Sequence, residues 1–326
     1  MKVFLAGGGG AVGKRLIPKL IAAGHEVTAS TRSTAKTGEM GALGATPVVL
    51  DALDRSAVMQ TVMQAEPEVV IHQLTALAGA TDFKHFDREF ELTNQLRTQG
   101  IDYLLAAAKA AGARRLIAQS YGNWNYARTG DGLKTEADAL DPAPPQNQQR
   151  SLGAIRYLES AVLGAAPIEG VVLRYGNFYG PGTSLSADGE VTQLVRKRRL
   201  PIIGQGTGVW SFIHIDDVAL AAVAAVEHGA AGVYNIVDDE PVPVSRWLPE
   251  LANAIGAKPP LHVPVWLGRL AAGEVGVSMM TQIRGTSNAK AKRELDWTPT
   301  YPTYREGFRN GLGVRAAANP GPIRSR

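Results

Sequence analysis

Three glycines near the start of the chain have the spacing of a phosphate-binding turn. Gly7, Gly10 and Gly13 form a G-x-x-G-x-x-G pattern that follows the apolar residues 3–5 and precedes an apolar pattern with helical spacing. Such glycines let the chain turn tightly, let a pyrophosphate approach bare backbone, and let the helix pack against the strand. The pattern predicts a dinucleotide site, and a glycine-rich turn without a ligand is the alternative. The residues predicted to bind are Gly7, Gly10, Ala11, Val12 and Gly13.

The end of the second predicted strand, residues 26–31, bears on which dinucleotide binds. An NAD site usually has Asp or Glu there to bind the ribose 2′-hydroxyl. Residues 28–34 contain no acidic side chain, and Arg32 stands between Thr31 and Ser33. A guanidinium flanked by hydroxyl groups suits a 2′-phosphate, so the sequence favours NADP(H) bound by Thr31 and Arg32. The alternative is that Arg32 is an ordinary surface arginine.

These residues need a scaffold that brings strand ends together, and the sequence indicates one. Strands are predicted at 46–51, 68–74, 114–120 and 170–175, with helical segments between them. The longest predicted helix covers 88–111, and another covers 151–163. Strands that alternate with helices predict an α/β fold, a doubly wound parallel sheet of the Rossmann type with helices on both faces. The predicted domains are a dinucleotide-binding domain of residues 1–180 joined by 210–238, a smaller C-terminal substrate lobe of 181–209 and 239–312, and a flexible tail of 313–326.

Composition limits the classes of partner. The 326 residues include no cysteine, so disulfides, thiolate nucleophiles and cysteine-bound zinc are excluded, and no metal site is predicted. The net charge is only +4, and the one dense basic run, residues 196–199, has no aromatic residues within it. We therefore expect a small-molecule substrate and no nucleic-acid partner. No apolar run reaches membrane-spanning length, which predicts a soluble, cytoplasmic protein with no membrane partner. A homodimer is left open.

Several later segments resemble motifs of one known family. Residues 70–75 read V-I-H-Q-L-T, residues 173–181 read L-R-Y-G-N-F-Y-G-P, and residues 212–218 read F-I-H-I-D-D-V. With the glycine pattern and Asn94, these motifs in this order resemble the extended or atypical short-chain dehydrogenases/reductases of the NAD-dependent epimerase/dehydratase group. The resemblance spans residues 2–312 and implies a Rossmann fold with a bound dinucleotide. It does not imply one reaction, because one fold hosts many chemistries.

The resemblance also implies cofactor contacts at the ends of later strands and in the long helix. The residues concerned are Asp51 and Ala52 at the adenine, Gln73, Leu74 and Thr75 at the nicotinamide ribose, Tyr175, Asn177 and Phe178 over the nicotinamide, and Asn94 in the long helix.

The acid–base pair of this family has no match at its expected place. The resemblance implies a Ser or Thr after the fifth strand and a Tyr-x-x-x-Lys on the next helix, where the lysine lowers the pKa of the tyrosine. With Glu159 aligned to the family's glutamate, Ser151 and Ile155 stand at the Tyr and Lys positions. Other residues could take over the roles of the missing pair. The candidates are Ser120 or Tyr121 to polarise the substrate oxygen, Tyr126 as proton donor, Arg156 as a fixed positive charge, and Lys134 and Glu136 as titratable groups. For each candidate, a packing or surface role is the alternative.

A second departure concerns the substrate. Nucleotide-sugar members of the family commonly have an arginine before their D-F-V-H-V-D-D motif, whereas Trp210 and Ser211 precede Phe212 here. An indole removes a phosphate partner and offers an apolar stacking face, although Trp210 could equally belong to the core. We take Trp210 and Tyr179 as predicted substrate contacts.

Taken together, these features predict an NADPH-dependent oxidoreductase for a small, mostly apolar or aromatic carbonyl compound or its alcohol. Two alternatives stay open: a sugar-nucleotide epimerase or dehydratase, and an NADP-binding sensor without catalysis.

Overall fold

Seven parallel strands form the central sheet. The computed structural model describes residues 1–77, 82–130 and 132–313, and the strand order in its sheet is β11-β6-β5-β4-β1-β2-β3. All six neighbouring pairs are parallel. The strands are β1 (Lys2–Ala6), β2 (Glu26–Thr31), β3 (Thr46–Val49), β4 (Val69–His72), β5 (Arg115–Tyr121), β6 (Glu169–Tyr175) and β11 (Gly232–Ile236). The predicted doubly wound parallel sheet is therefore confirmed.

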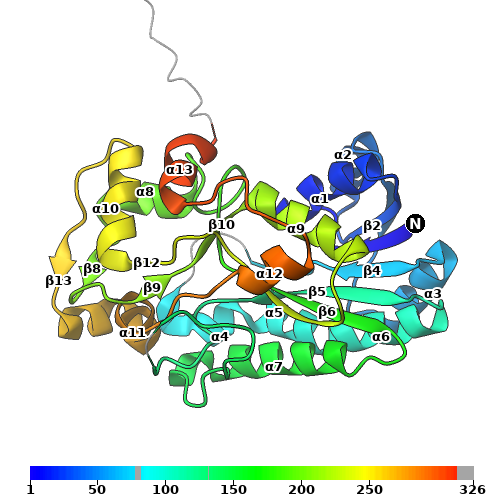
Figure 1. Cartoon of the computed structure of the whole chain (residues 1–326), viewed down its shortest axis with the longest axis horizontal. Coiled ribbons are helices and arrows are strands. Elements are labelled where there is room, and N and C mark those ends of the chain that lie inside the picture. Colours follow the sequence, from blue (N-terminus) through cyan, green and yellow to red (C-terminus); the bar gives the residue numbers. More distant parts are fainter. Residues whose placement is uncertain (78–81, 131, 314–326) are drawn as a thin grey trace, which may run out of the picture.

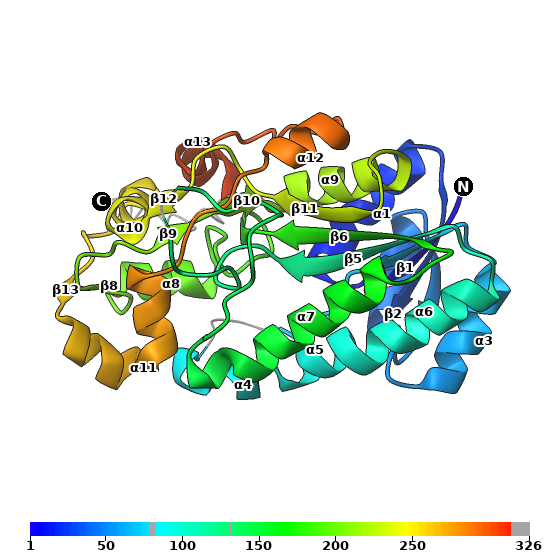
Figure 2. The same cartoon turned by 60° about the horizontal axis from the view of Figure 1, so that its bottom comes forward.

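Alternating apolar residues on the strands bury both faces of the sheet. Val3 and Leu5 of β1 pack in one apolar core with α1 and α9, whereas Phe4 and Ala6 pack in a second core with α3, α6 and α7. Figure 2 shows α9 on one side of the sheet and α6 and α7 on the other. The first layer comprises α1 (Ala11–Ala22), α2 (Thr37–Ala42), α9 (Ile215–Glu227) and α12 (Ala289–Glu294), and the second comprises α3 (Arg55–Ala65), α6 (Ile101–Ala110) and α7 (Gln149–Leu163).

The strand order reverses between β1 and β4, because the chain continues from β1 to β2 on one side and β4 pairs with β1 on the other. In doubly wound sheets, ligands bind at the carboxyl ends of the strands where the order reverses. The turn after β1 and the segment after β4 lie at this point.

The helix predicted over 88–111 is not continuous. It consists of α4 (Phe86–Glu89), α5 (Glu91–Gln95), a π-helical turn η3 (Leu96–Gly100) and α6. Thr98 is part of this irregularity, because its hydroxyl donates to the backbone carbonyls of Asn94 and Gln95. The apolar residues before and after the π turn each recur at helical spacing, so the sequence did not reveal the turn. The predicted segment is helical over most of its length, but it is interrupted at Phe90 and contains the π turn, in which Arg97 is buried.

A third apolar core lies beside the sheet, in residues 179–312. Trp247 is among its largest buried side chains, and Tyr304 and Phe308 join it from the end of the described chain. Figure 1 shows α8, α10, α11 and α13 gathered at this end of the molecule. The elements are β7 (Asn177–Tyr179), α8 (Glu190–Arg196), β8 (Ile202–Ile203), β9 (Val209–Trp210), β10 (Phe212–His214), β12 (Val242–Pro243), α10 (Val244–Ala254), β13 (His262–Val263), α11 (Val265–Thr281), α13 (Tyr304–Glu306) and η5 (Gly307–Gly311).

Short 3-10 turns complete the fold: η1 (Thr34–Lys36), η2 (Phe83–His85) and η4 (Gln146–Gln148). The domain boundaries stay a prediction, and nearly all of the predicted tail, from residue 314, lies outside the described residues. In the part of the chain that the structure describes, none of the helices combines the length and apolarity that a membrane crossing requires.

Candidate active site

The glycine turn after β1 forms the floor of a crevice. Gly7 has φ of +98°, and a Cβ atom on it would lie 2.7 Å from the carbonyl oxygen of Gln73. A Cβ atom on Gly13 would lie 2.4 Å from the carbonyl oxygen of Gly7. Both positions therefore require glycine. The N-cap residue of α1 is Gly10, which has no side chain, so the first N–H groups of that helix donate to no capping side chain. These donors suit an anionic group such as a pyrophosphate.

One pocket extends from this turn across the ends of β2 and β4. It is lined by Gly7, Gly9, Gly10, Ser30, Thr31, Arg32, Ser33, Lys36, Leu50, Ala52, Gln73, Leu74, Thr75 and Leu96. Eight residues that the sequence predicts to bind the cofactor are in this lining, from Gly7 to Thr75. Asp51 is absent from it, and its carboxylate instead accepts a hydrogen bond from the backbone N–H of Leu53.

The rim of the pocket at β2 carries two cations. The Arg32 side chain is exposed there, and the buried Thr31 accepts a hydrogen bond from the backbone of Ser33. Lys36 of η1 reaches back to the glycine turn, where its ammonium donates to the carbonyl of Gly9 at 3.1 Å. Sequence reasoning missed Lys36, although its place four residues after Arg32 in a loop without acidic residues was the available signal.

Two tyrosines meet at the carboxyl ends of β5 and β6. Tyr121 and Tyr175 are register partners in the sheet, and Tyr175 accepts a hydrogen bond from the side chain of Gln73 in the pocket lining. The Tyr121 hydroxyl donates to the side-chain oxygen of Asn177 at 2.5 Å. Asn177 is oriented by donating from its amide to the side chain of Asn123 and the backbone of Ser211. Phe178, on the same segment, packs its ring on Tyr175.

Burial sets the protonation state of Tyr121. Desolvation raises the pKa of its phenol well above the ordinary value, and the positive charge of Arg97 partly opposes that rise. Tyr121 is therefore a neutral hydrogen-bond donor at physiological pH.

An apolar group that we call the aromatic cluster surrounds Tyr121. Tyr121 lies 5.7 Å from Trp124 between ring centroids, and Trp124 meets Phe86 edge to face. The indole N–H of Trp210 donates to the carbonyl of Met279, which fixes the ring at the border of this cluster. The cluster comprises Phe86, Phe90, Trp124, Leu152, Ile155, Val275, Met279 and Ile283, with Phe83, Tyr121, Leu140 and Trp210 packed against it. Its members come from α4, α7, α11 and the loop after β5, so no sequence window contains it.

Comparison with known proteins decides the family. The sequence model of the NAD dependent epimerase/dehydratase family matches residues 3–237. The chain belongs to this family. The resemblance inferred from its motifs is confirmed.

Family relatives share most of their length with this chain. It is 41% identical over 311 residues to the 3-diazoavenalumate denitrifying reductase of a Streptomyces species, covering 94% of this chain and 99% of that protein. It is 30% identical over 267 residues to the 2-alkyl-3-oxoalkanoate reductase of Stenotrophomonas maltophilia, covering 79% and 76%. A crystal structure of UDP-glucose 4-epimerase from Thermotoga maritima has a TM-score of 0.75 at 23% identity and covers 96% of this chain and 97% of that one. The last match supports the fold alone.

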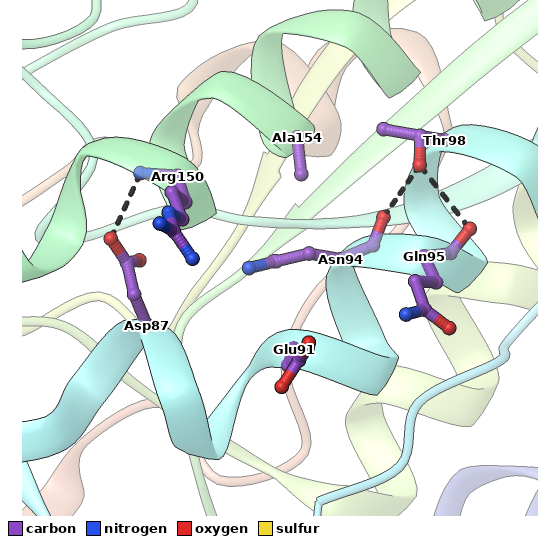
Figure 3. Close-up of a pocket in the computed structure, with 7 residues that line it drawn as sticks. All are labelled: Asp87, Glu91, Asn94, Gln95, Thr98, Arg150 and Ala154. Atoms are coloured by element: carbon purple, nitrogen blue, oxygen red, sulfur yellow. Dashed lines mark hydrogen bonds between the residues drawn. The ribbon is translucent and has the colours of Figure 1, made fainter.

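Ser151 and Ile155, which the sequence analysis aligns with the family's Tyr and Lys, both make structural contacts. On α7, the Ser151 hydroxyl donates to Asp87 at 2.6 Å and accepts from the amide of Asn94 at 3.1 Å. Ile155 lies in the aromatic cluster. Figure 3 shows Asn94 and Asp87 at a separate pocket between α5 and α7, together with Arg150. Asn94, a predicted cofactor contact, thus lines that pocket and not the crevice.

Two of the predicted catalytic hydroxyls belong to a buried network. Ser120 donates to Glu159 at 2.7 Å, and Glu159 forms a two-pronged ion pair with Arg174. Arg174 also donates to the Tyr126 hydroxyl, which in turn donates to Asn235 at 2.6 Å. Burial raises the pKa of Tyr126 to about 12. Ser120 and Tyr126 therefore belong to the network around Glu159 and Arg174, whereas Tyr121 donates to Asn177 outside it.

The remaining predicted groups lie elsewhere. Arg156 is exposed on α7 and donates to the backbone carbonyl of Asp141. Lys134 pairs with Asp138 and donates to a backbone carbonyl, and Glu136 accepts from the backbone of Asn235. Tyr179 is fully buried in the third core against Phe212 and Phe308 rather than beside the crevice.

Proposed function

We propose that this protein is an NADPH-dependent reductase of a small, mostly apolar or aromatic substrate. The observation that carries the proposal is the Tyr121 hydroxyl, which donates to Asn177 and packs against the aromatic cluster. Tyr121 is the register partner of Tyr175, and Tyr175 accepts a hydrogen bond from Gln73 in the lining of the dinucleotide pocket. Small-molecule sites commonly combine apolar and aromatic side chains with a few oriented polar groups. Two relatives that cover most of this chain are named as reductases, which favours reduction over epimerisation.

The residues of the crevice fit a dinucleotide. The uncapped start of α1 and the glycine turn would hold the pyrophosphate, and Arg32 with Lys36 would bind a 2′-phosphate. Gln73, Leu74 and Thr75 lie at the other end of the pocket, where the nicotinamide half would extend. A reduced dinucleotide bound there supplies a hydride.

Tyr121 would complete the reduction of a carbonyl compound. As the carbonyl carbon accepts the hydride, the oxygen gains an electron pair and takes the phenol proton of Tyr121. The resulting phenolate regains a proton from water, and the products are the alcohol and the oxidised dinucleotide. In the structure the phenol donates this proton to Asn177, so the hydroxyl would turn from Asn177 to the substrate oxygen, and the apolar side chains of the aromatic cluster would strengthen the new hydrogen bond.

A second candidate reaction is reduction of an aryl diazo compound, which the name of the 41% identical relative favours. An arenediazonium group that accepts a hydride forms a diazene, which releases N₂ and leaves a C–H bond. The negative charge of the hydride neutralises the positive charge of the diazonium group, so this reaction needs no proton donor. The absence of a Tyr-x-x-x-Lys pair at its expected place is compatible with such chemistry.

One experiment separates these reactions and the sensor alternative. The purified protein is incubated with NADPH and, in turn, with aryl ketones, β-keto esters and an arenediazonium salt, and the loss of NADPH absorbance is followed. The stereospecifically deuterated cofactor then shows whether deuterium enters the product. Carbonyl reduction is supported if a ketone is reduced and Tyr121→Phe abolishes it, whereas the diazo reaction should survive Tyr121→Phe. Tight NADPH binding without consumption by any acceptor contradicts the reductase proposal.

A further inference from the structure

Arg97 is a buried arginine for which the described residues provide no ion-paired carboxylate. Only 5% of its surface is exposed, and its Nη1 atom has no hydrogen-bond partner among the described residues. Its guanidinium lies over the ring of Phe90, 5.9 Å from the ring centroid. Burial lowers its pKa to about 10, so the group stays charged at neutral pH. Burying an unpaired charge is unfavourable, and such a group usually has a functional reason.

The charges around Arg97 do not neutralise it. Glu159 acts on it electrostatically, but that carboxylate is already bound by both prongs of Arg174 and by Ser120. His72 is also near, and burial lowers its pKa to about 4, so it is uncharged at neutral pH. Among the described residues, two arginines thus share one carboxylate in this part of the interior, which leaves one positive charge in excess.

The π turn places this charge at the carboxyl edge of the sheet. The carbonyl of Leu96 accepts a hydrogen bond from His72 at the end of β4, and Leu96 itself lines the dinucleotide pocket. His72 pairs in register with Ala118 of β5, the strand that ends at Tyr121. Arg97 therefore follows a pocket-lining residue, and the Phe90 ring under its guanidinium belongs to the aromatic cluster against which Tyr121 packs. The charge of Arg97 acts on the Tyr121 phenol in the direction that favours the phenolate.

We propose that Arg97 is a positioning residue that stabilises the negative charge left on the Tyr121 oxygen after this hydroxyl gives up its proton. In the family pattern a lysine on the helix after the fifth strand has this role, and Ile155 stands at its expected place. Here Arg97 supplies the positive charge from the π turn η3. The sequence alone suggested Arg156 of α7 for this role. The role of Arg97 in turnover rests on the proposed function. The effect of its charge on the Tyr121 phenol does not depend on that function.

The decisive test reads the ionisation of residue 121 without turnover. Tyr121 is replaced by 3,5-difluorotyrosine, whose phenol is a stronger acid than that of tyrosine and so offsets part of the rise in pKa that burial causes, and its titration is followed by fluorine NMR in the full chain. Arg97→Met and Arg97→Gln should each raise the pKa of this phenol by about one to three units, the size expected for losing a close opposite charge. Arg97→Lys should keep it near the wild-type value, and Arg156→Met, which removes an exposed arginine, should not move it. NADPH binding by each variant verifies that it folds.

Turnover gives a second readout. If a ketone is reduced, Arg97→Met should lower kcat with little change in KM, and Arg97→Lys should restore most of it. An unchanged phenol pKa in both neutral variants overturns the role of Arg97, whatever the substrate. A shifted pKa in a protein that reduces nothing leaves the electrostatic pair intact and contradicts the proposed function instead.

Discussion

At the scale of single residues, the tyrosine that ends β5 and the tyrosine in the loop after it have different surroundings. Tyr121 packs against the aromatic cluster and donates to Asn177, whereas Tyr126 is enclosed between Arg174 and Asn235. Both are phenols that burial makes weaker acids. Only their partners distinguish a candidate proton donor from an interior hydrogen-bonding group.

Substitution of each tyrosine should separate these roles. Tyr121→Phe should lower kcat for a ketone by about 10²–10⁴-fold with unchanged NADPH affinity, the usual effect of losing a general acid. Tyr126→Phe should leave kcat nearly unchanged and lower the free energy of unfolding by about 1–3 kcal/mol, because two buried groups lose a partner. Steady-state kinetics and urea unfolding measure these effects. Equal kinetic losses in both variants would show that the assignment is wrong.

Arg32 and Lys36 should set the choice of dinucleotide. Each can make a charge-assisted hydrogen bond to a 2′-phosphate, so Arg32→Ala and Lys36→Ala should each weaken NADPH binding roughly ten- to a hundredfold. NADH binding should change little, which makes it the control. Fluorescence titration of both dinucleotides decides the matter, and equal affinities of the unmodified protein for NADPH and NADH speak against NADP specificity.

At the scale of elements, α7 is fixed to α4 by one carboxylate. Asp87 accepts hydrogen bonds from the backbone N–H groups of Arg150 and Ser151 and from the Ser151 hydroxyl. It therefore caps the start of α7 from another helix, as a side-chain acceptor does at an N-terminus. The Ser151 side chain that the sequence analysis aligns with the family's tyrosine thus takes part in helix packing.

Removing this cap should loosen α7 locally. Asp87→Ala should lower the free energy of unfolding by about 1–2 kcal/mol and speed hydrogen exchange in the first turn of α7. Asp82→Ala is a matched control, because Asp82 caps the short turn η2 at the surface. If exchange in α7 is the same in both variants, Asp87 does not hold the helix.

The end of β4 gives the fold a dependence on pH. His72 is buried and its pKa is lowered from 6.5 to about 4, so the unfolded chain binds a proton in this range that the folded chain does not. The free energy of unfolding is therefore highest above pH 6.5 as far as His72 is concerned. It decreases by about 3 kcal/mol as the pH falls towards 4. Urea unfolding at both ends of this range should show a smaller loss for His72→Gln. The same loss in both proteins would assign the effect to other groups.

At the scale of the whole molecule, the site is formed where the sheet meets the third core. The crevice belongs to the strand ends, and the aromatic cluster is completed by α11, which follows the sheet by many residues in sequence. Trp210 borders this cluster and packs at 5.0 Å from Trp247 of the third core. The two interpretations of Trp210, as a substrate contact and as a core residue, are therefore compatible with each other.

This arrangement should favour apolar ligands over nucleotide sugars. In a thermal-shift assay with NADPH present, aryl ketones should raise Tm, because burial of apolar area contributes about 25 cal/mol per Å². UDP- and dTDP-sugars should give little response, because a diphosphate would lose hydration without a guanidinium at position 210. A saturable shift with a nucleotide sugar would favour the epimerase alternative.

The sequence by itself determined the features that depend on local chemistry. The glycine spacing, the basic loop after β2 and the alternation of strands and helices each act within a short window, so they predicted the sheet and most of the pocket lining that the structure describes. Tertiary structure alone decided the surroundings of each hydroxyl, because Ser120 and Tyr126 join the network around Glu159 and Arg174, whereas Tyr121 packs against the aromatic cluster and donates to Asn177. It also revealed Arg97, since a π turn and the absence of a partner for a buried charge are properties of packing in three dimensions rather than of spacing along the chain.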